Sequence, residues 1–190
     1  MNISTTLPGI FEPRSDALFS PCRRWRYTLH RIWAPTPGPL MVIGLNPSTA
    51  DEIKNDPTVT RCINFAHAKG FGGLVMMNAF AYRATDPQVM RRQAKEFGTD
   101  VVGPDNDFWL VKMAEEANSI VLAWGNHGLY QGRQNQVVNL FLHRLLWCFG
   151  TTKQGAPKHP LYLPGNIGLE LFQPVKFPRI PGQEDDGYPD

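Results

Sequence analysis

The chain has 190 residues, of which 42% are apolar and 11% aromatic, so it can bury a core of ordinary size and does not have the composition of a disordered protein. Its 19 basic and 17 acidic residues give a formal charge of +2 at pH 7. Residues 183–190 hold four of the acidic residues and no basic one, which leaves residues 1–182 at +6. We therefore expect one domain over 1–182, followed by an acidic C-terminal tail.

Several classes of protein do not fit the sequence. No stretch approaches the roughly 18 consecutive apolar residues of a membrane span, and MNISTT at the start lacks the features of a secretion signal. Cys22, Cys62 and Cys148 lie far apart and form no CxxC pair, which argues against a zinc site or a disulfide framework. We expect a cytoplasmic monomer without a metal, a cofactor or a membrane partner.

The hydrophobic pattern predicts short buried strands that alternate with amphipathic helices. Residues 24–33 alternate apolar and polar side chains, which predicts a half-buried strand or a hairpin arm after an irregular arm over 1–22. Apolar runs predict buried strands over 40–45, 73–77, 119–123 and 161–163. Helices are expected from Asp56-Pro57 to Gly70, from about Pro87, over about 104–117 and over about 134–149.

This order predicts an α/β fold with three α/β/α layers, a central four-stranded, mainly parallel sheet and an N-terminal β-arm. Ligands of such sheets bind beyond the carboxyl ends of the strands. Each predicted strand end carries an amide that both donates and accepts, which suits a neutral heterocycle: Asn46, Asn78, Asn126 and Asn166. A single Asn at such a place is more often a turn residue.

Aromatic and glycine residues stand beside these amides. Phe80, Tyr82 and Trp124 are candidates for a wall that stacks on a ligand, and Gly44 lets the backbone approach it closely. Taken singly, Phe80 and Trp124 are more often core residues. Asp51 and Asp56 are likewise more often solvated or capping carboxylates, so the residues alone name no reaction.

Longer motifs resemble known families. LMVIGLNPSTAD at 40–51, NAFAYRATDP at 78–87 and KHPLYLP at 158–164 look like a bacterial family called domain of unknown function 1643. GLNP at 44–47 also resembles the water-activating motif of mismatch-specific uracil/thymine-DNA glycosylases. GLVMMNAF at 73–80 is similar to the strand of the uracil-DNA glycosylase superfamily that ends in the base-reading Asn. This second likeness covers roughly residues 40–172.

The resemblance implies a monofunctional DNA glycosylase, an N-glycosyl hydrolase that flips out a modified or damaged base and leaves an abasic site. It implies that Asn46 holds the attacking water; we expect Asp51 or Asp56 to supply a carboxylate. The base-binding set is then Asn78, Phe80, Tyr82, Trp124, His127 and His159. Expected contacts to the DNA backbone come from Gly44, Pro47, Ser48, Arg83, Lys158, Gly165, Asn166 and, as a wedge, Ile167.

The sequence departs from the superfamily pattern in two places. His159-Pro160 precedes the last predicted strand instead of following it, so the motif histidine's role does not transfer to His159. No aromatic residue follows Asn46 to exclude 5-substituted pyrimidines, which suggests hydroxymethylcytosine or its glucosylated form in viral DNA, or uracil, as the target, with an antiviral role. The alternatives are a non-catalytic binder of modified DNA or nucleotides, and a nucleoside or nucleotide hydrolase.

Overall fold

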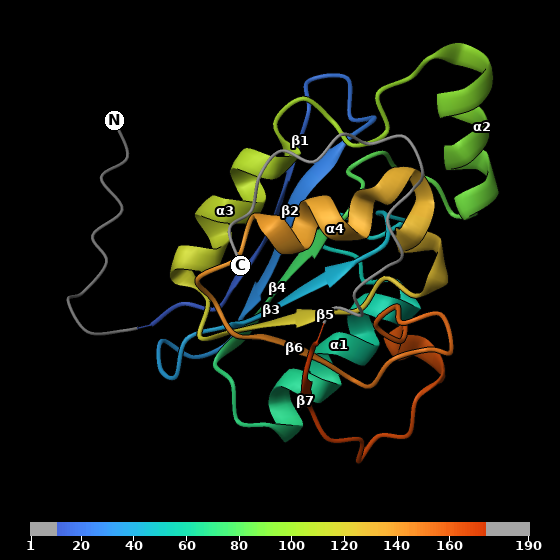
Figure 1. Ribbon diagram of the computed structural model, residues 1–190. Coiled ribbons are helices and arrows are strands. Elements are labelled where there is room, and N and C mark those ends of the chain that lie inside the picture. The colour runs from blue at the N-terminus through green and yellow to red at the C-terminus, as the bar shows by residue number, and fades with distance from the viewer. Residues whose placement is uncertain (1–10, 174–190) are drawn as a thin grey trace, which may run out of the picture.

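The computed structural model describes residues 11–173, which form one mixed seven-stranded sheet in the order β1-β2-β4-β3-β5-β6-β7 (Figure 1). The strands are β1 Arg14–Phe19, β2 Arg26–Ile32, β3 Leu40–Gly44, β4 Gly73–Asn78, β5 Ser119–Leu122, β6 Leu146–Cys148 and β7 Glu170–Leu171. The α-helices are α1 Pro57–Ala68, α2 Pro87–Phe97, α3 Asn106–Glu116 and α4 Arg133–Asn139. Two 3-10 helices are η1 Asn126–Gly132 and η2 Pro160–Tyr162.

The centre of the sheet is parallel and its two edges are antiparallel. β3 pairs in parallel with β4 and β5, and β5 pairs in parallel with β6. The hairpin β1–β2 joins β4 antiparallel, and β7 joins β6 antiparallel. The predicted α/β class is confirmed, whereas the predicted four-stranded, mainly parallel sheet is wrong because these three antiparallel strands extend it.

Helices cover both faces of the sheet (Figure 1). On one face, α1 packs its Val59, Cys62 and Phe65 against the sheet residues of a first buried cluster. On the other face, α3 and α4 contribute Leu110 and Val137 to a second buried cluster. The start of α1 follows the predicted signal, because Asp56 accepts a hydrogen bond from the amide of Val59 (2.8 Å) and Pro57 opens the helix.

Strand β2 is one arm of a hairpin with β1, which confirms the predicted hairpin arm, but it lies inside the sheet, so the predicted half-burial is wrong. β1 covers its outer edge, in a segment for which an irregular arm was expected. α3 lies over the face that carries Thr28 and His30, which line a cavity together with Trp109 of that helix. Every residue of β2 except Ile32 is consequently buried, including Arg26 and Arg31.

Two predictions near the C-terminal side are also wrong. The helix expected over 134–149 ends at Asn139, and β6 takes the place beside β5. An apolar run such as 146–149 fits a helical face as well as a buried strand, and the open edge of β5 decides for the strand. Residues 161–163 lie between Pro160 and Pro164 and form no strand; Pro160 starts η2 instead.

No helix among residues 11–173 is long and apolar enough to cross a membrane. The predicted acidic tail at 183–190 lies outside the described residues, as do the first ten residues of the expected N-terminal arm.

Gly72 joins the β2–β3 loop to the start of β4, and its substitution tests this packing. A Cβ at this position would lie 2.1 Å from the carbonyl oxygen of Pro37 and 2.7 Å from that of Ala34. We expect Gly72→Ala to lower the free energy of unfolding by about 1–3 kcal/mol or more, since backbone atoms must move to make room. Denaturant unfolding measures the change. Gly168→Ala, where nothing lies within 4 Å of the added Cβ, is the control and should change stability little.

Candidate functional site

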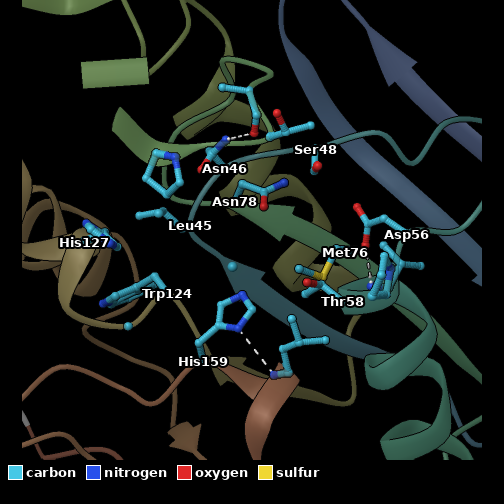
Figure 2. A pocket seen from close by; sticks show the side chains of 18 of the residues that line it. Leu45, Asn46, Ser48, Asp56, Thr58, Met76, Asn78, Trp124, His127 and His159 are labelled. Carbon is cyan, nitrogen blue, oxygen red and sulfur yellow. Dashed lines mark hydrogen bonds between the residues drawn. The ribbon is translucent and has the colours of Figure 1, made fainter. Parts of the chain in front are cut away.

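A cleft of about 620 Å³ opens at the carboxyl ends of the parallel strands (Figure 2). Its lining comes from the segments that follow β3, β4 and β5, from the start of α1 and from residues 159 and 161. This is the edge of a parallel sheet at which ligands bind. The volume is within the range of roughly 300–1,000 Å³ typical of small-molecule sites.

The side chain of Asn46 is held in one orientation. Its Nδ2 donates to the carbonyl oxygens of Ala84 (2.7 Å) and Pro47 (3.2 Å). The amide of Ala84 in turn donates to the carbonyl of Pro47 (2.9 Å), so the loops after β3 and β4 brace each other. Because both contacts use the nitrogen, the acceptor Oδ1 of Asn46 remains for a ligand or a water in the cleft.

Asn78, at the end of β4, is buried and lies beside Gly44 of β3, its partner in the parallel register. A Cβ on Gly44 would approach the side-chain amide of Asn78 to 3.2 Å and Met76 Cε to 2.7 Å, so a side chain here would displace the Met76 methyl group and crowd Asn78. The Asn78 amide is satisfied when Nδ2 donates to the carbonyl of Met77 (3.2 Å) and Oδ1 accepts from Arg26 Nη2 (3.3 Å). One amide hydrogen and one lone pair are then left for a ligand.

Arg26 is the main residue that the sequence pattern did not identify as part of the site. Its side chain is 1% exposed, lines the cleft and donates from Nη1 to the carbonyl of Ala50 (3.0 Å). Within residues 11–173 it forms no salt bridge, and its buried Nε has no hydrogen-bond partner. Burial lowers the pKa of Arg26 to about 10, an effect that the charge of Asp56 partly offsets. A buried cation without an ion pair is costly, and such groups cluster at functional sites.

Of the two carboxylates considered, the structure places Asp56 in the cleft and Asp51 outside it. Asp56 is buried, and its N-cap bond to α1 uses Oδ1 alone. Asp51 instead accepts from the amides of Ile53 (2.9 Å) and Lys54 (2.7 Å), and these bonds lower its pKa. The buried Arg31 ties the same loop to β2 by donating to the carbonyl of Asp51 (2.8 Å).

His159 faces Asn46 across the cleft (Figure 2). Its Nδ1 accepts a hydrogen bond from the amide of Leu161 (3.3 Å), which leaves the proton of the neutral ring on Nε2. Burial lowers the pKa of His159, although Asp56 partly opposes this. The ring is therefore a neutral hydrogen-bond donor at pH 7, and it lies directly before η2, where the sequence places it before a predicted strand.

The predicted aromatic wall is only partly present. Trp124 lines the cleft, but it is 1% exposed and donates from its indole to Gln134 Oε1 (3.0 Å). Phe80 is completely buried in the core beneath α3 and α4. Tyr82 packs edge-on against Trp25, with ring centroids 6.3 Å apart, and does not line the cleft.

The remaining predicted residues divide into two groups. Ser48 and the exposed His127 line the cleft with those already described. Pro47 and Arg83 lie close by, in the loops after β3 and β4, without lining it.

Lys158 and the loop after η2 lie outside the cleft lining. The amide of Lys158 donates to the carbonyl of Gly150 (2.9 Å). Gly165 and Asn166 are exposed, whereas the expected wedge Ile167 packs partly buried against the α1-side core. In the described part of the chain, no three His, Cys, Asp or Glu side chains gather as a metal site would require.

Residues 26–161 match the family described as "Protein of unknown function (DUF1643)". The chain belongs to this family. The match confirms the predicted family, and the description names no activity. No curated protein and no solved structure matches the chain. All residues that line the cleft, from Arg26 to Leu161, lie within the matched range, so the cleft belongs to the part of the chain that defines the family.

The burial of His159 predicts a pH dependence of stability. A histidine with a lowered pKa in the folded state binds protons more readily in the unfolded chain, so the free energy of unfolding falls as the pH drops below about 6.5. We expect His159→Gln to make the loss of stability between pH 7 and pH 5 smaller. Part of the loss should remain, because burial also lowers the pKa of His30. Denaturant unfolding at both pH values measures it. An unchanged pH dependence, equal to that of the exposed-site control His143→Gln, would contradict the prediction.

Proposed function

We propose that this protein is a DNA glycosylase, which takes an extruded base into the cleft and hydrolyses its N-glycosidic bond to leave an abasic site. The observation that carries the proposal is the braced amide of Asn46, which keeps Oδ1 as an acceptor in the same cleft as the buried pair Asn78–Arg26. The likeness of residues 44–47 and 73–80 to glycosylase motifs supports the same assignment.

In the proposed reaction, one side chain orients the attacking water and another accepts its proton. Oδ1 of Asn46 accepts a hydrogen bond from the attacking water and so orients it toward C1′ of the sugar. An amide does not take the proton at neutral pH, but the Asp56 carboxylate lines the same cleft and has one oxygen outside the helix cap. As the water attacks, the C1′–O bond forms, the C1′–N bond breaks, its electron pair goes to the base, and the water's proton passes to Asp56.

Three other side chains of the cleft hold the base and stabilise its negative charge. Asn78 has one donor and one acceptor left for the polar edge of the base, and His159 adds a neutral N–H. The guanidinium of Arg26, held against Asn78, favours the negative charge that develops on the leaving base. A charge placed in advance in a buried site is worth more than the same charge in water.

The walls of the cleft favour a base with a substituent at C5. Small side chains line it beside Asn46, namely Ser48, Ala84 and Thr85, and none of the lining residues is an aromatic side chain projecting freely into it. We therefore propose hydroxymethylcytosine or its glucosylated form as the base, with uracil, which is smaller and enters the same space, as the alternative. A hydroxymethyl or glucosylated base would imply a defence against viral DNA.

Asn46→Ala tests the reaction. We expect turnover to fall by at least about 100-fold, because the water loses its orienting acceptor, while DNA affinity changes little. The measurement is alkaline cleavage at abasic sites in duplexes that carry uracil, a thymine mismatch, hydroxymethylcytosine or its glucosylated form. Asn64→Ala, at an exposed position of α1, is the matched control.

Three outcomes would contradict this function. Unchanged turnover in Asn46→Ala would remove the water-positioning role. DNA retention without abasic sites on any substrate would indicate a non-catalytic binder. Release of bases from free nucleosides or nucleotides, with no competition by DNA, would indicate a hydrolase of monomers.

Arg26→Gln tests how the leaving base is stabilised. We expect kcat to fall by about 100- to 1,000-fold with little change in DNA affinity, as when a preorganised donor is removed from an enzyme site. The loss should be larger for uracil than for 5-fluorouracil, because the more acidic base needs less help to carry a negative charge. Single-turnover rates on the two duplexes measure this. An equal loss on both would assign Arg26 a structural role only, and thermal unfolding of the variant checks that it folds.

A further inference from the structure

A second hollow adjoins the cleft and is basic. It measures about 340 Å³ and is lined by Arg23, Arg24, Ser48, Tyr82, Arg83, Ala84 and Thr85. We call it the arginine hollow. Ser48, Ala84 and Thr85 line both the hollow and the cleft, so these three residues form a rim that the two share.

Two of the three guanidinium groups in the hollow are left without a carboxylate. Arg23 forms a two-pronged salt bridge with Glu52, at 2.8 and 3.0 Å. Within the described residues, Arg24 and Arg83 take part in no salt bridge. The hollow therefore has a positive charge that the surrounding residues do not neutralise.

The hollow is braced rather than formed by loose surface chains. The amide of Arg83 donates to the carbonyl of Arg24 (2.9 Å), and its Nη1 donates to the carbonyl of Arg23 (3.3 Å). The guanidinium of Arg83 lies 4.9 Å from the centroid of the Phe19 ring, and that of Arg24 lies 5.5 Å from the Trp25 ring. These contacts hold the cations of the β1–β2 turn beside the loop after β4.

The chemistry of the hollow fits a phosphodiester. Guanidinium groups present N–H donors in a planar fork that matches phosphate oxygens, and the hydroxyls of Ser48 and Thr85 add donors on the side of the cleft. The site for a backbone phosphate next to an extruded nucleotide must meet two conditions. It must lie outside the base pocket, and it must lie close to that pocket, because the phosphate is covalently attached to the nucleotide. A hollow that shares a rim with the cleft meets both conditions.

We propose that the arginine hollow binds a backbone phosphate of a polynucleotide strand, next to the nucleotide whose base enters the cleft. The position of that nucleotide rests on the proposed function, whereas the phosphate contact itself requires no reaction. The substrate class is then a nucleic-acid chain, because a free nucleoside has no phosphate to place in the hollow. Arg23 and Arg24 precede the range that matches the family, so the hollow is only partly built from that range.

Salt-dependent binding tests the proposal. The probe is a fluorescein-labelled 21-base-pair duplex with one uracil, and fluorescence anisotropy gives its dissociation constant from about 50 to 300 mM KCl. Removing this phosphate contact with Arg24→Gln/Arg83→Gln should reduce the slope of log K against log[salt] by about 0.9, the contribution of one neutralised phosphate. The control Arg92→Gln/Lys95→Gln removes the same charge from exposed positions of α2 and should leave the slope nearly unchanged.

Equal slopes for the two double variants would overturn the proposal, because net charge alone would then explain the binding. If Arg24→Gln/Arg83→Gln does not fold, Arg24→Glu alone, at an exposed position, should still weaken binding more than Arg92→Glu. Full displacement of the duplex by millimolar deoxyuridine monophosphate would assign the hollow to free nucleotides and overturn the assignment to a strand.

The failure of this proposal is distinguishable from failure of the proposed function. A reduced slope without abasic sites on any duplex would keep the phosphate site and remove the glycosylase. Abasic sites with an unchanged slope would keep the glycosylase and remove the phosphate site.

Discussion

The parallel pairing of β3 with both β4 and β5 is the constraint on which the site depends. It brings three strand ends to one edge of the sheet and sets Gly44 directly opposite Asn78. The pairing continues past the strands, where the amides of Ala79 and Phe80 donate to the carbonyls of Gly44 and Leu45. The loops after β3 and β4 consequently leave the sheet side by side, and only then does the carbonyl of Ala84 reach the side chain of Asn46.

Local signals in the sequence predicted the elements that begin with a capping motif. They missed the elements whose type or burial depends on packing against residues far along the chain. Asp56-Pro57 and Asp86-Pro87 begin helices where their capping chemistry requires it. The run at 146–149 is apolar enough for a helix or a strand, and only the free edge of β5, more than twenty residues earlier, selects the strand. β2 likewise alternates like a half-buried strand, but β1 pairs with its outer edge and α3 lies over Thr28 and His30. The loop at 50–54 covers its arginines, since carbonyls of that loop accept hydrogen bonds from Arg26 and Arg31.

The candidate site was predictable where a residue lies at the end of a strand or just beyond it, as Asn78 and Asn46 do. Arg26 was not, because a charged residue in an alternating strand normally points to solvent, and nothing nearby in the sequence reveals that this strand is covered. The choice between Asp51 and Asp56 also required the structure. Both are acidic residues after β3, but Asp51 turns its carboxylate onto its own loop, and Asp56 caps a helix that begins in the cleft.

The charges in the cleft suit a reaction that separates charge. As a glycosidic bond breaks, the sugar becomes positive and the base negative, while the substrate as a whole gains no charge. The cleft holds one carboxylate, Asp56, and one buried guanidinium, Arg26, close enough for the carboxylate to raise the guanidinium's pKa. Under the proposed function, a neutral base enters a site whose two opposite charges balance, and each charge gains its full effect only in the transition state. Under the proposed phosphate contact, Arg24 and Arg83 hold the strand equally before and during the reaction, so they contribute affinity rather than rate.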